Sequence, residues 1–199
     1  MPTPESITPE RAERLKNVLE ARQPTLTVVF ERVHDAHNVS AVIRSCDAVG
    51  ILEAHGIYYG RQVFPTLGAK SSASARKWVD VHLHNDVASC FAALRSRGFA
   101  IYTTHMSSDA VSLYSLDLTK PTALVFGNEH EGVSEEARSL ADGNFLIPQV
   151  GMIQSLNISV ACAVSLYEAY RQRSNAGMYG APQLSEEQLS TLRADWSSR

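Results

Sequence analysis

The chain has 199 residues, a length that predicts one sizeable globular domain and leaves little room for a second. Hydrophobic residues make up 44% and charged residues 20%, ordinary proportions that exclude a wholly disordered or low-complexity chain. The net charge of −3 excludes a generally basic surface, so any site for RNA must be a local patch.

The first predicted element is a helix that starts at Pro9 with Thr8 as its N-cap. A strand over 26–31 follows, and Asn38 is the predicted N-cap of a second helix that Gly50 ends. Short apolar strands are then expected at Ile57–Tyr59, Trp78–Leu83, Phe99–Thr103, Ala123–Phe126 and Phe145–Ile147. This alternation of strands and helices predicts an α/β fold, a mostly parallel sheet with helices on both faces.

A long apolar segment over 155–173 is predicted to be a largely buried helix, and a short tail helix follows with Ser185 as its cap. No apolar run approaches the roughly 18 residues of a membrane span, and the charged N-terminus lacks a signal-peptide core, which favours a cytoplasmic protein. We expect three regions: an N-terminal helix (1–24), a core domain (25–175), and a C-terminal linker with the tail helix (176–199).

Several familiar signatures are missing from the sequence. It contains no G-x-G-x-x-G, no G-x-x-x-x-G-K-[ST] and no G-x-S-x-G, which excludes the usual dinucleotide, P-loop and hydrolase sites. His34 and His37 are close together, as are His82 and His84, but no cysteine or carboxylate cluster completes either pair. The three widely separated cysteines predict neither a disulfide framework nor a zinc ribbon. We therefore expect no metal.

Three polar segments lie where a predicted buried strand meets a helix, which is where open α/β sheets bind ligands. The first, HNVSAVIRS (37–45), contains Asn38 and Arg44; a capping asparagine and a solvated arginine are its simpler explanation. The second, LVFGNEHEGVS (124–134), is either a tight turn or a pair of carboxylates that bind something. The third, IPQVGMIQSLNIS (147–159), opens the long helix with more polar groups than a cap requires.

In this order and at these separations, the three segments resemble the three motifs of the SpoU/TrmH family of RNA ribose 2′-O-methyltransferases. The resemblance spans roughly residues 9–180 and is strongest to the branch that methylates guanosine 18 of tRNA. It implies a SPOUT fold with a C-terminal trefoil knot, S-adenosylmethionine as cofactor, tRNA as partner and a homodimer. The knot comes only from the resemblance, since connections between elements ordinarily do not thread.

The resemblance also assigns site residues. The catalytic set it implies is Asn38, Arg44, Glu129, Ser155 and Asn157. The cofactor is expected to contact three loops, represented by Thr103, Thr104, Gly127, Ile147, Met152 and Leu156. Because the net charge is negative, affinity for tRNA must come from clustered cations and neighbouring polar groups. Our candidates are Arg11, Arg14, Arg22, His37, Arg171 and Arg173.

A guanidinium is always protonated, so Arg44 is a poor literal base. We expect it to bridge a substrate phosphate and the 2′-oxygen and to stabilise the developing negative charge. Two alternatives remain open from the sequence: methylation of another tRNA position or of ribosomal RNA, and an RNA-binding module without catalytic activity.

Overall fold

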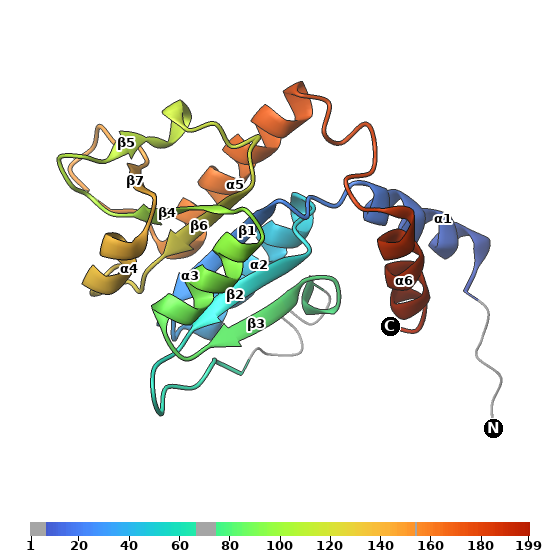
Figure 1. The fold of residues 1–199 in the computed structure, drawn as a ribbon, viewed down its shortest axis with the longest axis horizontal. Coiled ribbons are helices and arrows are strands. Elements are labelled where there is room, and N and C mark those ends of the chain that lie inside the picture. Colours follow the sequence, from blue (N-terminus) through green and yellow to red (C-terminus); the bar gives the residue numbers. More distant parts are fainter. Residues whose placement is uncertain (1–6, 67–74, 154) are drawn as a thin grey trace.

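The computed structural model describes residues 7–66, 75–153 and 155–199. They form a seven-stranded sheet in the order β3-β2-β1-β6-β4-β7-β5, and each pair of neighbouring strands is parallel (Figure 1). The strands are β1 (Leu26–Glu31), β2 (Glu53–Ile57), β3 (Asp80–His84), β4 (Ala100–Thr104), β5 (Val111–Ser112), β6 (Thr122–Phe126) and β7 (Gly143–Leu146). Every residue of the adjacent strands β1 and β6 is buried, which is why apolar residues predominate in both.

Helices cover both faces of this sheet, as the sequence predicts (Figure 1). The helices are α1 (Pro9–Glu20), α2 (Ala36–Ala48), α3 (Val87–Ser96), α4 (Glu135–Leu140), α5 (Ile158–Asn175) and α6 (Glu186–Ser197), with short 3-10 turns η1 (Ala75–Lys77) and η2 (Leu113–Ser115). Apolar side chains of α2 and α5 share one core with the sheet, and those of α3 and α4 share the other. The α/β prediction is confirmed, whereas the knot stays a prediction.

The first and last helices lie together beside the sheet (Figure 1). Leu15 and Leu19 of α1 pack with Leu189 and Trp196 of α6 in a small core of their own. The two end regions expected from the sequence therefore meet in space, although the three-region division stays a prediction. No helix in the described part of the chain is long and apolar enough to cross a membrane.

Two helices begin at other residues than predicted. Asp35, not Asn38, caps α2: its carboxylate accepts the backbone N–H of His37 at 2.8 Å. Helix α5 begins at Ile158 and not at residue 155, and Asn157 caps it by accepting the backbone N–H of Ser159 at 2.9 Å. The correction matters because Asn38 then lies inside the first turn of α2, where its side-chain amide is free to bind other groups. The two-residue strand β5 went unpredicted because so short a segment carries no periodic pattern.

Arg173, which we expected to bind RNA, is fully buried, and that prediction is wrong. Its guanidinium donates to the backbone carbonyls of Thr25, Leu118 and Lys120 at 2.9, 2.8 and 3.0 Å. Burial lowers the pKa of this group to about 10, which leaves it charged at neutral pH. Arg173 thus joins the end of α5 to the segments that lead into β1 and β6.

Arg22 is the second predicted RNA ligand that proves to be buried, with 1% of its surface exposed. It pairs with the Asp47 carboxylate at 2.6 Å and donates to the carbonyl of Ile51 at 3.0 Å. The ring of Trp196 lies over its guanidinium at 4.9 Å. Arg22 therefore ties α6 to the core domain and is inaccessible to RNA.

We expect Arg173→Ala to lower the free energy of unfolding by about 3 kcal/mol or more, because it leaves several buried carbonyls without donors. The matched control is Arg171→Ala, two residues earlier on α5. The Arg171 side chain is exposed and pairs with Glu168, so its loss should cost less than about 1 kcal/mol. Urea denaturation of both variants measures the difference, and equal midpoints would contradict the structural role of Arg173.

Candidate functional site

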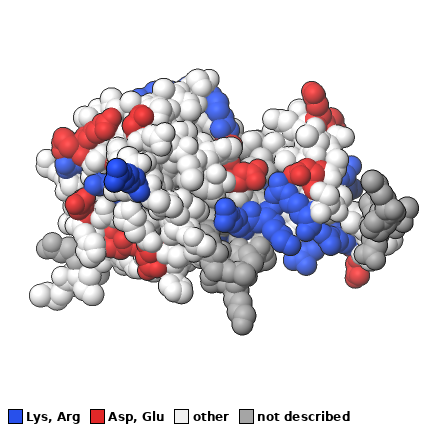
Figure 2. Space-filling model, turned by 90° about the horizontal axis from the view of Figure 1, so that it is seen from below, with Lys and Arg blue, Asp and Glu red and all other residues white. Residues whose placement is uncertain are grey.

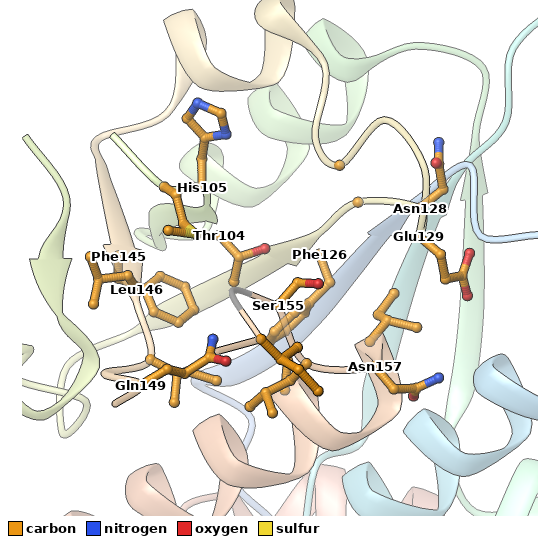
Figure 3. Close-up of a pocket in the computed structure, with 18 of the residues that line it drawn as sticks. Thr104, His105, Phe126, Asn128, Glu129, Phe145, Leu146, Gln149, Ser155 and Asn157 are labelled. Carbon is orange, nitrogen blue, oxygen red and sulfur yellow. The ribbon is translucent and has the colours of Figure 1, made fainter. Parts of the chain in front are cut away.

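A cavity of about 1040 Å³ opens at the carboxyl ends of β4, β6 and β7 (Figure 3). Its walls come from the loops after these three strands and from the first turn of α5. These are the loops in which the sequence predicts a ligand. Carboxyl ends of parallel strands are where α/β sheets place their binding sites.

The loop after β6 is unusually tight. Asn128 and Gly132 form a backbone bridge, and the Asn128 side chain accepts the N–H groups of His130 and Glu131 at 2.9 and 2.8 Å. A Cβ atom on Gly127 would lie 1.9 Å from the carbonyl carbon of Gly132. Only glycine therefore fits at position 127, and the loop conformation depends on it.

Glu31, at the end of β1, binds the end of this loop that leads into α4. Its buried carboxylate accepts the backbone N–H of Ser134 at 2.8 Å and the hydroxyl of Tyr59 at 2.6 Å. Burial, followed by the hydrogen bond to Glu31, raises the pKa of Tyr59, which therefore stays protonated and donates. The loop after β6 is thus held to the centre of the sheet at both of its ends.

Asn38 joins the three polar segments to one another. Its Nδ2 donates to Oε1 of Glu129, and its Oδ1 accepts from Nδ2 of Asn157 at 3.2 Å. Glu129 and Asn157 lie at the same end of the cavity (Figure 3). Asn38 itself is only 9% exposed, so both of its hydrogen bonds are largely shielded from water. One residue from each predicted segment therefore takes part in a single hydrogen-bonded chain.

A second hollow of about 730 Å³ adjoins the first and shares the loop after β6 with it. The side chains that line only this second hollow are all polar: Arg32, His34, Asp35, Asn38 and Gln62. Arg32 has a positive φ of 55°, a conformation that few non-glycine residues adopt. Its ion pair with Glu131 at 2.5 Å and its position over the Tyr59 ring hold it there. The two hollows thus differ in chemistry: the larger combines apolar with polar side chains, whereas the residues that line only the smaller are all polar.

Most residues predicted to contact the cofactor line the larger cavity: Thr104, Gly127, Ile147 and Leu156. Thr103 does not, because strand alternation turns its side chain into the protein, where it is fully buried beside Asn144. A contact between Thr103 and the cofactor stays a prediction. Met152 lies in the expected loop, but its side chain is exposed and outside the cavity lining.

Of the predicted catalytic residues, the structure brings Asn38, Glu129, Ser155 and Asn157 to the two hollows and leaves Arg44 apart. Arg44 is exposed on α2 and lines neither hollow. Six positions separate it from Asn38, which turns the two side chains to different sides of the helix. Within the described residues, the Arg44 side chain forms no hydrogen bond or ion pair.

The remaining candidate RNA ligands, Arg11, Arg14 and His37, are exposed, whereas Arg171 is exposed but paired with Glu168. Figure 2 shows Lys and Arg side chains gathered at the end of the molecule where α1 and α6 lie. Lys77 and Arg199 are two further cations near this end that the sequence did not predict as RNA ligands. They lie together because Arg199 donates to the backbone carbonyl of Lys77.

Other residues line the larger cavity without being among the predicted contact residues: Asn128, Gln149 and Ile153 lie within the predicted segments, and His105 lies outside them. His105 and Asn128 are predictable from the sequence, because His105 is the first residue after β4 and Asn128 is the second residue after β6. His105 lies 2.7 Å from a guanidinium nitrogen of Arg138, a contact that crosses from β4 to α4 and leaves no trace in the sequence.

The family follows from a comparison of the whole chain with known proteins. Residues 25–167 match the model of the SpoU rRNA Methylase family, and the chain belongs to this family. It is 49% identical to the tRNA (guanosine(18)-2′-O)-methyltransferase of Thermus thermophilus, over 95% of this chain and 96% of that protein.

Solved structures agree with this assignment. The crystal structure of the A. aeolicus TrmH/SpoU tRNA modifying enzyme is 40% identical and covers 94% of this chain and 95% of its own, with a TM-score of 0.88. The SpoU methyltransferase AviRb from Streptomyces viridochromogenes, solved in complex with the cofactor AdoMet, is 28% identical, covers 78% and 59%, and has a TM-score of 0.68. The SPOUT architecture expected from the resemblance is therefore confirmed.

We expect Gly127→Ala to destabilise the protein by about 3 kcal/mol, because the added methyl group must displace backbone of the same loop. Gly151→Ala is the matched control: a Cβ there meets nothing within 4 Å. Thermal unfolding of the two variants tests the expectation. A Gly127→Ala protein as stable as the Gly151→Ala protein would show that the loop is not constrained as described.

Proposed function

We propose that this chain transfers a methyl group from S-adenosylmethionine to the ribose 2′-hydroxyl of guanosine 18 in tRNA, in the cytoplasm. The observation that carries the proposal is the hydrogen-bonded chain of Glu129, Asn38 and Asn157, which gathers three polar segments beside two adjoining hollows. The names of the full-length relatives support the choice of tRNA and of guanosine 18.

The larger cavity suits the cofactor. Its volume is at the upper end of the range usual for small-molecule sites. Phe126, Ile147 and Leu156 offer apolar contact to an adenosyl group. The carboxylates of Glu129 and Glu131 favour a positive charge in this cavity. When bound, S-adenosylmethionine supplies an electrophilic methyl group on a sulfonium centre. The residues of this cavity hold it without a metal ion.

The polar hollow receives the target nucleoside. Arg32, Asn38 and Gln62 offer hydrogen bonds to ribose and phosphate oxygens, and the loop with Glu129 borders both hollows. A 2′-hydroxyl held there lies next to the cofactor cavity. This adjacency provides the positioning on which methyl transfer to a weak nucleophile depends.

Arg44 reaches the reacting atoms from a second copy of the chain. Its guanidinium is exposed and unoccupied within the described residues, and it lies outside both hollows of its own chain. Val160, Tyr167 and Tyr170 of α5 are 47%, 55% and 40% exposed, an apolar surface that a homodimer would bury. Leu166, on the same helix, is not part of this surface, because it packs into the core of its own chain.

Arg44 stabilises charge and does not act as a base. A planar guanidinium can bridge a phosphate oxygen and the 2′-oxygen as the hydroxyl loses its proton to that phosphate or to water. Ser155 borders the larger cavity and helps to position these groups. Glu129 cannot move freely, because its carboxylate accepts the amide of Asn38.

The tRNA backbone is held by the cations at the α1–α6 end (Figure 2). Arg11 and Arg14 on α1 are exposed, and Lys77 and Arg199 lie beside α6. Contacts of this kind are to phosphate, so they add affinity for tRNA without selecting a sequence.

Two other functions share the same motifs. An enzyme that methylates another tRNA position or a ribosomal RNA would have the same three loops. An RNA-binding module without activity would bind RNA equally well with and without S-adenosylmethionine. The hydrogen-bonded chain of site residues favours an active enzyme, because a module without activity has no need to keep it.

We expect Arg44→Ala to reduce methyl transfer by about a thousandfold or more while leaving the affinity for S-adenosylmethionine nearly unchanged. Arg44→Lys should fail as well, since an ammonium group cannot bridge two oxygens with a planar fork. Labelled-methyl transfer and calorimetry measure the two properties. The control is Arg95→Ala, an exposed arginine of α3 paired with Asp142. Normal turnover by the lysine variant would remove Arg44 from the mechanism.

A homodimer is expected at micromolar concentration, because the exposed apolar and aromatic surface of α5 is unfavourable in water. Light scattering should report twice the 21.8 kDa of one chain. Val160→Asp, placed in the proposed interface, should shift the protein toward the monomer and lower its activity. A wild-type protein of 21.8 kDa with full activity would refute the dimer.

The substrate is tested with tRNA transcripts in which guanosine 18 is replaced. The unmodified transcript should accept one methyl group and the replaced transcript none, because the nucleoside hollow is proposed to receive that guanosine. Mapping of 2′-O-methylation on total RNA from a deletion strain provides the cellular control. Equal methylation of both transcripts would make the guanosine assignment wrong, although the 2′-O-methyltransferase activity would stand.

A further inference from the structure

Three potential metal ligands converge at the β3 edge of the sheet, on the face that α3 covers. His55 comes from β2, His84 from the end of β3 and Cys90 from α3. The parallel register pairs His55 with His82 and Ile57 with His84, which turns all three histidines toward this face. Helix α3 packs against both strands, so Cys90 meets the histidines from above the sheet.

The donor atoms are close enough to bind one ion. One nitrogen of each histidine and the Cys90 sulfur all lie within 4.8 Å of one another, and Nδ1 of His55 is 3.0 Å from Nε2 of His84. Two nitrogens at the usual zinc distance of about 2.1 Å and a tetrahedral angle would be about 3.4 Å apart. The two imidazoles therefore need to separate by only a few tenths of an ångström.

The surroundings of the second ring nitrogen of His55 also resemble those of a metal ligand. His55 is 4% exposed, and its Nε2 has no hydrogen-bond partner within the described residues. It faces Oε1 of Glu53 at 3.9 Å, and Glu53 is itself held by an ion pair with Arg97. In zinc sites the second nitrogen of a ligating histidine usually donates a hydrogen bond to a carboxylate or a carbonyl. A small movement of Glu53 toward His55 would form such a hydrogen bond.

We propose that His55, His84 and Cys90 bind one zinc ion that joins β2, β3 and α3. Two imidazoles and a thiolate are ligands that zinc prefers, and among the described residues these three donors converge, so water takes the fourth position. On binding, Cys90 releases its thiol proton to solvent and its sulfur bonds to the ion. None of the three residues lines either hollow, so the ion stabilises the sheet edge and takes no part in methyl transfer.

The sequence pattern does not reveal this site, because no cysteine or carboxylate cluster stands beside His82 and His84 in the chain. The three ligands are separated by 29 and 6 positions, a spacing that matches no familiar zinc motif.

The test uses the full-length chain without an affinity tag, stripped with a chelator and dialysed against micromolar Zn²⁺. We expect one zinc per chain, a dissociation constant at or below about 1 µM, and a Tm raised by about 5 °C or more. Cobalt in place of zinc should give the intense absorption of a thiolate-bound tetrahedral ion.

Cys90→Ala and His84→Gln should each abolish zinc retention and the rise in Tm. The matched control is Cys46→Ala, since Cys46 is equally buried but lies in the core on the other face of the sheet. This variant should retain zinc even if its own Tm falls. A wild-type chain that retains no zinc, or a folded Cys90→Ala chain that retains one, would overturn the proposal.

Discussion

The site depends on the two hydrogen bonds of the Asn38 side chain. A side-chain amide has a donor end and an acceptor end, and here a carboxylate faces the first and a second amide faces the other. Because Asn38 is buried in the first turn of α2, its position is set by the packing of that helix. Glu129 and Asn157 are then positioned relative to α2, and through them the loops after β6 and β7. Loss of the central amide would leave both partners without their contact.

Charged residues inside the protein keep this arrangement rigid. The Glu31 carboxylate binds a backbone N–H of the loop after β6. Arg173 joins the C-terminal part of α5 to the segments that lead into β1 and β6. Arg22 holds α6 in the same way. These arginines are buried in the fold, so we propose the exposed cations of α1 and its neighbours for the contacts with RNA. In this proposal the phosphate contacts lie at the α1–α6 end, apart from the site at the sheet.

The sequence predicted the sheet, both helix layers and the three loops of the site, since apolar strand patterns and glycine positions are local signals. It misplaced the start of α2 because Asp35 and Asn38 are equally good caps, and only packing decides between them. It could not tell the buried Arg22 and Arg173 from the exposed Arg11 and Arg14, because burial depends on distant segments. The convergence of His55, His84 and Cys90 likewise exists only after β2, β3 and α3 have packed.

The most direct test of this account is a double-mutant cycle on methyl transfer with Asn38→Ala, Asn157→Ala and the double variant. If one hydrogen-bonded chain positions the three loops, each single substitution already removes most of the rate of methyl transfer that this positioning provides. Single losses of about a hundredfold should then combine to little more than a hundredfold in the double variant. Losses that multiply to about ten-thousandfold would show that the two residues act independently and would contradict the central role of Asn38.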